Sequence, residues 1–220
     1  MPSARLKQIQ RHIKPAADIF AIIDNNKAFL HHLNPTYFLP RSAAVQPQAP
    51  AILHFSRTNK TISRNYAEYS RRARDLAFYL KAENGRVAVL APNTPMVLEA
   101  FFAISAANRI SVVVNYRLSK EEVLWILSHA QCTLCIVDQE YVHLVDGWTG
   151  QILVDSDHDG RSGPYEEAIL QGSKMSGEWD DLSIHDHPEH ETMSISYTSG
   201  TTSNPKVCYL RPNFELIQRV

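Results

Sequence analysis

Apolar and polar residues form alternating blocks along this chain, and these blocks predict helices and strands in turn. Apolar side chains recur at spacings of three and four over residues 66–81, which predicts a helix with one buried face. Pro95 opens a second helix that runs to about Ala107, because proline is tolerated at the first helical position. Ser119 and Glu122 form the capping-box pattern that starts a third helix.

Short apolar runs lie before, between and after these helices and predict strands, with 86–91 and 111–114 of the kind that is buried in a parallel sheet. They are residues 51–55, 86–91, 111–114, 133–137 and 151–154. Residues 192–197 alternate apolar and polar side chains, which predicts a half-buried strand. Residues 61–62 are expected to pair with the first run, and a short helix is expected at 165–170. Strands that alternate with helices predict an α/β fold, a largely parallel sheet flanked by helices.

The segment after the last of these strands is rich in groups that bind phosphate. Residues 198–206 carry five serine or threonine hydroxyls, Gly200 and Lys206. Successive backbone N–H groups form an anion-binding nest, glycine lets the backbone approach a ligand, and lysine adds positive charge. Ligands of open α/β sheets bind at the carboxyl ends of the strands, where this loop is expected to lie. The pattern predicts a polyphosphate site, and a flexible serine-rich linker is the alternative interpretation.

This loop differs from the P-loop of nucleotide triphosphatases and resembles another family. A GxxxxGK[ST] motif is excluded, because the loop has one glycine and Val207 follows the lysine. The stretch YTSGTTSNPK, residues 197–206, is similar to the phosphate-binding loop of the adenylate-forming (AMP-binding) superfamily. Three upstream segments also resemble that family and occur in its order: residues 66–69, 87–95 and 115–122. The resemblance runs from about Leu33 to Lys206 and is to the amino-terminal portion of an acyl-CoA synthetase or ligase.

The resemblance implies ATP-dependent activation of a carboxylic acid, as in fatty acid metabolism. The acid would form an acyl-adenylate and then an acyl-CoA, with ATP, Mg²⁺ and coenzyme A as cofactors and a small-molecule carboxylic acid as partner. The residues implied to bind the β- and γ-phosphates are Thr198, Ser199, Gly200, Thr201, Thr202 and Lys206. The region of Arg117 and Glu121 is expected to be structural, and the resemblance assigns no catalytic residue and no protein metal ligand within this chain.

The resemblance stops soon after the lysine. Val207 and Cys208 stand where the family usually has Gly-Val, and residues 210–214 no longer follow its pattern. We therefore expect an N-terminal helical extension over 1–34, a partial AMP-binding domain over 35–206 and a divergent tail over 207–220. The family's adenine- and ribose-binding motifs are not found here, so the isolated chain is expected to be inactive as an enzyme. The alternative hypothesis is a non-catalytic truncated α/β binding or interaction module, and an exposed core would favour self-association.

Composition narrows the function classes further. A net charge of −1 gives no basic surplus for nucleic-acid binding, and no apolar run reaches the ~18 residues of a membrane span. Three cysteines and the lack of a secretory signal pattern favour a reducing compartment, and the cytoplasm is expected. Basic residues before Asp18 leave a mitochondrial presequence open beside an amphipathic helix, and a peroxisomal location is also open.

Three other clusters have a structural interpretation. Cys132 and Cys135 have redox-motif spacing but lead into a strand, which favours buried structural cysteines. Three histidines at 185, 187 and 190 lie around a proline without helical spacing, which favours a solvated linker over a metal site. Alternating aspartates over 155–159 follow a strand rather than a helix, which argues against a calcium loop.

Overall fold

The computed structural model describes residues 34–56, 60–82, 84–156, 162–175, 177–182, 191–198, 206–211 and 216–219. Apart from Asn34, the expected helical extension over 1–34 lies outside these residues, so that prediction is not tested. In the described part of the chain, every helix falls short of the length and apolar character that crossing a membrane requires.

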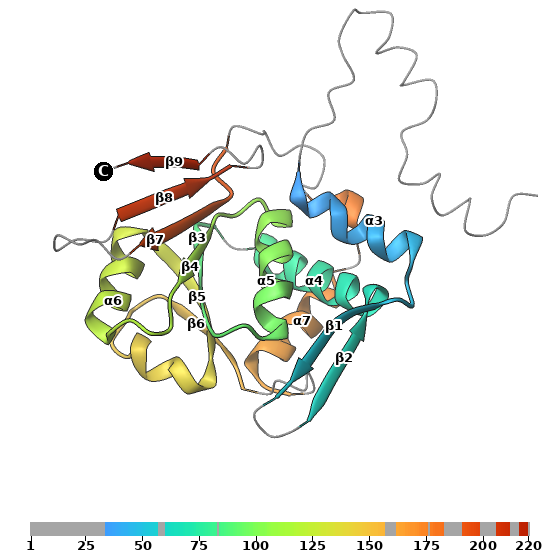
Figure 1. Cartoon of the computed structure of the whole chain (residues 1–220), viewed down its shortest axis with the longest axis horizontal. Helices are drawn as coiled ribbons and strands as arrows, with labels where there is room; N and C mark the ends of the chain where they lie inside the picture. Colours follow the sequence, from blue (N-terminus) through green and yellow to red (C-terminus); the bar gives the residue numbers. More distant parts are fainter. Residues whose placement is uncertain are drawn as a thin grey trace, which may run out of the picture.

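A seven-stranded sheet forms the centre of the molecule (Figure 1). Its order is β6-β5-β3-β4-β7-β8-β9. The first five of these strands in space are parallel, and the last two continue the sheet as an antiparallel meander. The bounds are β3 Arg86–Leu90, β4 Ser111–Val114, β5 Cys132–Asp138, β6 Gln151–Asp155, β7 Ser194–Thr198, β8 Lys206–Leu210 and β9 Leu216–Arg219. The predicted α/β fold with a largely parallel sheet is confirmed.

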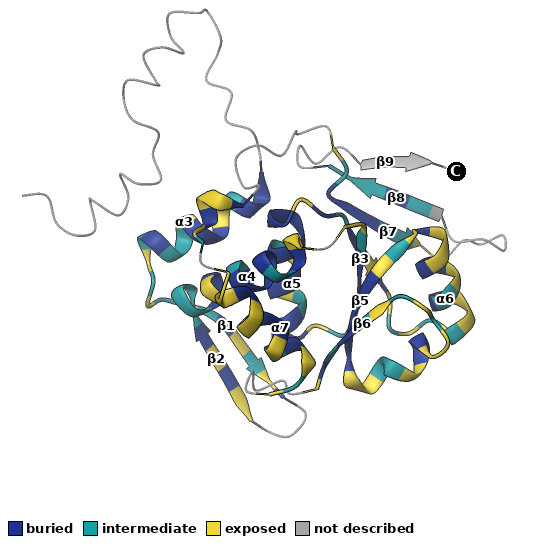
Figure 2. Cartoon of the chain, turned by 180° about the vertical axis from the view of Figure 1, so that it is seen from behind, coloured by how far each residue is buried: buried dark blue, intermediate teal, exposed yellow. Residues whose placement is uncertain are grey.

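Helices cover the two faces of the sheet unequally. One face packs against α4 (Tyr66–Lys81), α5 (Pro95–Ala106) and α7 (Pro164–Ser173), and the other packs against α6 (Lys120–His129) and the 3-10 helix η2 (Gln139–Val145). Successive strand residues point to opposite faces, so Val87 and Val89 enter the first core while Ala88 and Leu90 enter the second. Figure 2 shows β3, β5 and much of α5 in the colour of buried residues, as a parallel sheet covered on both faces requires.

Local signals in the sequence fix where the helices begin. Asn65 Oδ1 accepts a hydrogen bond of 2.8 Å from the Glu68 N–H at the start of α4. Pro95 stands in the first turn of α5, as expected. The predicted capping box of α6 is present, with Ser119 and Glu122 bonded reciprocally at 3.3 and 2.8 Å.

Smaller elements complete the fold beside α4 and α5. β1 (Pro50–Phe55) and β2 (Thr61–Asn65) form a separate antiparallel pair, which confirms the expected pairing of the first run with residues 61–62. The 3-10 helix η1 (Pro35–Tyr37) leads into α3 (Phe38–Val45), and η3 (Trp179–Asp181) follows α7. The helix expected at 165–170 is present and longer, as α7.

The sequence analysis did not predict β8 and β9. Both lie in or at the edge of the segment 207–220, where a divergent tail was expected. β8 adds to the sheet by backbone pairing with β7, and β9 by backbone pairing with β8, which apolar periodicity does not reveal.

Candidate phosphate-binding site

The carboxyl ends of β3, β4 and β7 lie at one edge of the sheet. The three strands are parallel and in register, with Val87 beside Ser111 and Ser111 beside Ser194. The helices that leave β3 and β4, α5 and α6, lie on opposite faces of the sheet, which is the topology of a switch point. Ligands of open α/β sheets bind outside the strand ends at such a point.

The predicted phosphate loop begins and ends at this edge. β7 ends at Thr198, whose side chain is exposed, and Thr198 pairs directly with Lys206, the first residue of the antiparallel strand β8. The two ends of the loop are therefore held on neighbouring strands at the carboxyl end of β7. The part of the loop between these two strands lies outside the described residues, and so does the Lys206 side chain. The role of Ser199, Gly200, Thr201, Thr202 and Lys206 therefore stays a prediction.

The base of the loop is anchored by β7 itself. Ile195 is buried among the apolar residues of α6, and Ser194 and Ser196 point to the opposite face. The predicted alternation of this strand is confirmed, with β7 beginning at Ser194 rather than at residue 192.

Tyr197, directly before Thr198, contacts the last turn of α6. Its hydroxyl oxygen lies 2.8 Å from Nδ1 of His129, at hydrogen-bonding distance. Burial, with the nearby Cys132 and Tyr209, raises the pKa of Tyr197 to about 12, so this hydroxyl stays protonated at neutral pH. The sequence analysis missed His129, and the signal for it was the spacing of four between Trp125 and His129 on one helix face.

The turn after β4 is held by local hydrogen bonds and leads into α6 at the same edge. Asn115 Oδ1 accepts a hydrogen bond of 3.0 Å from the Arg117 N–H, and the Arg117 guanidinium carbon lies 5.6 Å from the centre of the Tyr116 ring. Hydrogen bonds from its own backbone N–H and from the Ser119 hydroxyl lower the pKa of the exposed Glu121. These contacts are all local to the turn, which agrees with the structural role expected for the region of Arg117 and Glu121.

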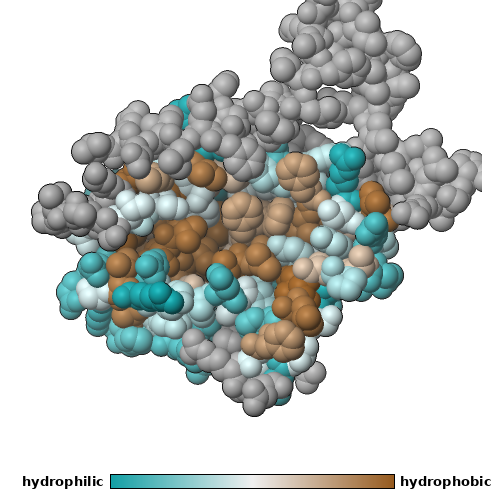
Figure 3. Space-filling model, in the orientation of Figure 1, coloured by the Kyte–Doolittle hydropathy of each residue, from teal (hydrophilic) through white to brown (hydrophobic). Residues whose placement is uncertain are grey.

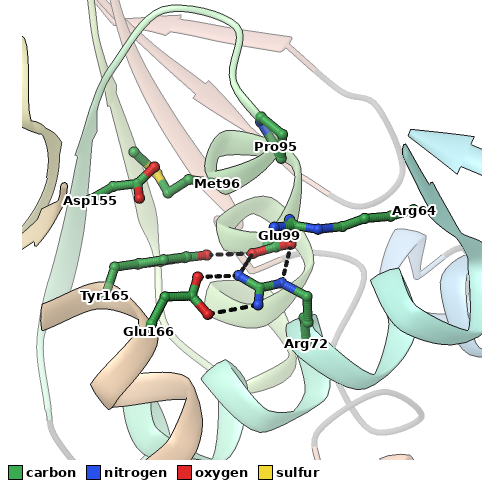
Figure 4. A pocket seen from close by; sticks show the side chains of 8 residues that line it. All are labelled: Arg64, Arg72, Pro95, Met96, Glu99, Asp155, Tyr165 and Glu166. Carbon is green, nitrogen blue, oxygen red and sulfur yellow. Dashed lines mark hydrogen bonds and ion pairs between the residues drawn. The ribbon is translucent and has the colours of Figure 1, made fainter. Parts of the chain in front are cut away.

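Away from the predicted phosphate loop, a cluster of charged groups is buried between α4, α5, α7 and β2 (Figure 4). Glu99 is completely buried and accepts hydrogen bonds from Arg72 Nε at 2.7 Å, from Tyr165 Oη at 3.0 Å and from Arg64. Arg72 also donates to Glu166 at 2.7 Å. Burial opposes the charge of Arg72, but its hydrogen bonds and ion pairs with Glu166 and Glu99 outweigh burial and raise its pKa.

This buried cluster stabilises the packing of β2, α4, α5 and α7 and is not a ligand site. The small pocket that it lines has a free volume of about 10 Å³, close to the room that one water molecule needs. Burial and the Glu99 carboxylate raise the pKa of Tyr165, which keeps its hydroxyl a hydrogen-bond donor.

The cysteines of the redox-like spacing are structural, as predicted. Cys135 is buried and Cys132 half-buried, and neither forms a disulfide. Burial raises the pKa of Cys132 to about 12, so its thiol is a poor nucleophile at neutral pH. Among the described residues no group of three or more histidine, cysteine or acidic side chains could hold a metal ion. The histidines at 185, 187 and 190 and the aspartates at 157 and 159 lie outside that part of the chain.

The comparison with known families decides the assignment. The family model described as AMP-binding enzyme matches residues 39–214. The chain belongs to the AMP-binding enzyme family. The resemblance predicted from the four motifs is confirmed, and the match includes the first residues of the segment 207–220.

Curated relatives support this membership over most of the chain. The chain is 30% identical to a peroxisomal acetate/butyrate–CoA ligase of Arabidopsis thaliana over 79% of its own length and 34% of the relative. It is 30% identical to an acetate–CoA ligase of Humulus lupulus over 84% of its length and 36% of the relative. The chain thus spans about a third of the length of the curated relatives it matches.

Solved structures of the family share the fold. The fatty acyl CoA synthetase of Mycobacterium tuberculosis has a TM-score of 0.64 at 21% identity, over 82% of this chain and 35% of that one. The N-terminal domain of FACL13 from the same organism has a TM-score of 0.64 at 22% identity, over 81% of this chain and 44% of that one. At these identities the likeness shows the fold alone.

Proposed function

We propose that this chain supplies the ATP phosphate-binding part of an acyl-CoA ligase, which activates a small-molecule carboxylic acid. The observation that carries the proposal is the position of the family's loop motif at the switch-point edge of the sheet, between the paired residues Thr198 and Lys206. Loops at this edge are where α/β folds bind nucleotides, and the hydroxyl, amide and lysine donors of residues 198–206 fit phosphate oxygens.

The reaction proposed has two steps. A carboxylate oxygen attacks the α-phosphorus of ATP, the bond to the β-phosphate oxygen breaks, and pyrophosphate leaves with the negative charge. The thiol of coenzyme A then attacks the acyl carbon, and AMP leaves with the electrons of the acyl–oxygen bond.

In this mechanism Thr198, Ser199, Gly200, Thr201, Thr202 and Lys206 bind the β- and γ-phosphates. Donors that already point at the leaving pyrophosphate stabilise the charge that builds in the transition state. Mg²⁺, when bound, would be coordinated by phosphate oxygens and would neutralise part of their charge. The residues that receive the acid and coenzyme A are not among those assigned here.

The chain corresponds to only part of its relatives, which limits the steps of this reaction that it is proposed to support. Because the chain spans about a third of its relatives, we propose that turnover needs residues beyond these 220, whereas phosphate binding needs only the loop and its sheet. The compartment proposed is the cytoplasm, which the free thiols of Cys132, Cys135 and Cys208 support.

A non-catalytic interaction module is the second candidate function. It is favoured by large apolar side chains that stay exposed on α5 and β4, namely Leu98 at 46%, Phe101 at 36% and Val113 at 46%. Figure 3 shows apolar surface gathered over this part of the molecule. Such a patch marks an interaction surface in a folded protein.

Equilibrium binding of nucleotides to the 220-residue chain tests the first proposal. Isothermal titration with Mg²⁺ present should give affinities that fall from ATP to ADP to AMP, because the loop holds the β- and γ-phosphates. Equal affinity for the three nucleotides, or no binding of any, would refute the assignment of the loop.

A further inference from the structure

Three aromatic rings meet where β7 reaches α6. His129 stacks on Trp125 with ring centres 4.7 Å apart and an angle of 17° between the rings. The Tyr197 ring stands edge-on to both, at 6.1 Å from Trp125 and 5.8 Å from His129. We refer to these three residues as the aromatic cluster. Stacking and edge-to-face packing fix the orientation of the imidazole, so Nδ1 points at the Tyr197 hydroxyl.

Three groups on other strands of the sheet interact electrostatically with Tyr197. Cys132 of β5 and Tyr209 of β8 both raise the pKa of Tyr197, and burial raises the pKa of the Cys132 thiol itself. Arg86 of β3 opposes this shift through its positive charge, and its guanidinium donates a hydrogen bond of 2.8 Å to the Ala130 carbonyl oxygen.

Tyr197 joins the cluster to the proposed phosphate site. It is the last residue of β7 before Thr198, and its partner across the hairpin, Val207, directly follows Lys206. A side chain that is fixed at this position limits how β7 and β8 twist and separate at their open end. The geometry of Thr198 and Lys206 therefore depends on a residue 68 positions away from Tyr197 in the sequence.

We propose that His129 is a positioning residue of the phosphate site, which holds the Thr198 end of β7 in its pairing with Lys206 through the Tyr197 hydroxyl. The proposal rests on the proposed function of residues 198–206. His129 itself does not touch phosphate. It acts by preorganising the end of the hairpin, so that little ordering is needed when the ligand binds.

Hydrogen exchange measured by mass spectrometry tests the positioning directly, without any ligand. His129→Leu and Tyr197→Phe each remove the hydrogen bond, and exchange in peptides over 194–198 and 206–210 should become roughly 2- to 10-fold faster, the range expected from one hydrogen bond. His129→Asn places an amide near the position of Nδ1 and should restore most of the protection. The exposed His143 of η2 provides the control variant, His143→Leu, which should leave the hairpin unchanged.

The double variant His129→Leu/Tyr197→Phe separates one shared interaction from two independent ones. Its exchange should be no faster than that of either single variant, because both remove the same bond. Additive effects would overturn the proposal. So would hairpin exchange that stays unchanged in His129→Leu while the melting temperature falls, since that result describes packing alone.

Binding of magnesium tripolyphosphate extends the test to the site. His129→Leu and Tyr197→Phe should weaken the affinity by a similar 2- to 10-fold, with rescue by His129→Asn. Equal affinity in all variants would overturn the role in the site. If the unmodified chain does not bind tripolyphosphate, the proposed phosphate function fails, and the exchange experiment still decides whether His129 holds the hairpin.

Discussion

Thr198 and Lys206 face each other as paired residues of two antiparallel strands at the carboxyl end of β7. The pairing sets the distance between the ends of the predicted phosphate loop before any ligand arrives. A loop whose ends are fixed loses less conformational entropy when it closes on an anion. This relationship connects the sheet to the proposed function.

The buried ion pairs of Glu99 predict a large loss of stability when its charge is removed. Glu99→Gln leaves the buried guanidinium groups of Arg64 and Arg72 without a full countercharge. We expect the free energy of unfolding to fall by about 3–5 kcal/mol, measured by urea denaturation. Glu167→Gln, at an exposed glutamate of α7, is the control and should change little. If both variants change the free energy of unfolding by a similar amount, the buried cluster does not stabilise the fold.

The helices α7 and α4 approach each other closely at Gly172, which predicts that a larger residue there lowers stability. A Cβ atom at Gly172 of α7 would lie 1.7 Å from the backbone oxygen of Asp75 in α4, so the helices have to move apart to accept one. Gly172→Ala should lower the free energy of unfolding by about 1–3 kcal/mol, although alanine favours helices. Gln171→Ala, on the exposed side of the same turn, should be neutral or slightly stabilising. An increase in melting temperature for Gly172→Ala would contradict the packing of α7 on α4.

The pKa of Cys132 predicts loss of stability at alkaline pH. Its pKa is about 12 in the folded chain and near 9 when unfolded, so the folded state binds more protons between these values. Stability from this group is complete below pH 9 and falls as the pH rises towards 12. Urea denaturation at pH 8 and pH 10.5 gives the free energy of unfolding at each pH. The fall in this free energy from pH 8 to pH 10.5 should be smaller in Cys132→Ala than in the unmodified chain. If the free energy of unfolding falls equally in the variant and in the unmodified chain, other groups cause the loss of stability at alkaline pH.

The apolar patch on α5 and β4 predicts self-association. Replacement of exposed apolar side chains, as in Phe101→Glu or Val113→Lys, should shift the isolated chain towards monomer in sedimentation experiments. Leu170→Glu, at an exposed position on α7 outside this patch, is the matched control and should not alter the oligomeric state. A chain that is monomeric before any substitution would refute this prediction.

The chain's enzymatic competence has a separate test. The 220 residues alone should show no exchange between ATP and pyrophosphate with acetate, butyrate, octanoate or benzoate, even if they bind nucleotide. Exchange with any of these acids would show that the chain carries a complete adenylation site.

Local patterns in the sequence predicted much of the fold. The capping box of Ser119 and Glu122, the position of Pro95 and the apolar runs each depend on residues within a few positions of one another. They gave the helices α4, α5, α6 and α7 and the five parallel strands correctly, whereas α3 was not predicted. β8 was missed because its place depends on backbone pairing with β7.

The candidate site was predicted in part for the same reason. The motif over 198–206 is contiguous, so its place at a strand end followed from the sequence. The contact of His129 with Tyr197 joins residues on separate elements, and no single segment shows it. Glu99 gave a usable signal, because a lone acidic residue within the apolar stretch that forms α5 requires a buried partner.

The affinity of Lys206→Ala for magnesium tripolyphosphate tests the central claim most directly. Isothermal titration should show a loss of about 10- to 100-fold, because a charged donor to phosphate is removed. Lys174→Ala, at an exposed lysine after α7, should bind like the unmodified chain. Equal affinities in the unmodified chain and in Lys206→Ala would contradict the assignment of this loop to the phosphates of ATP.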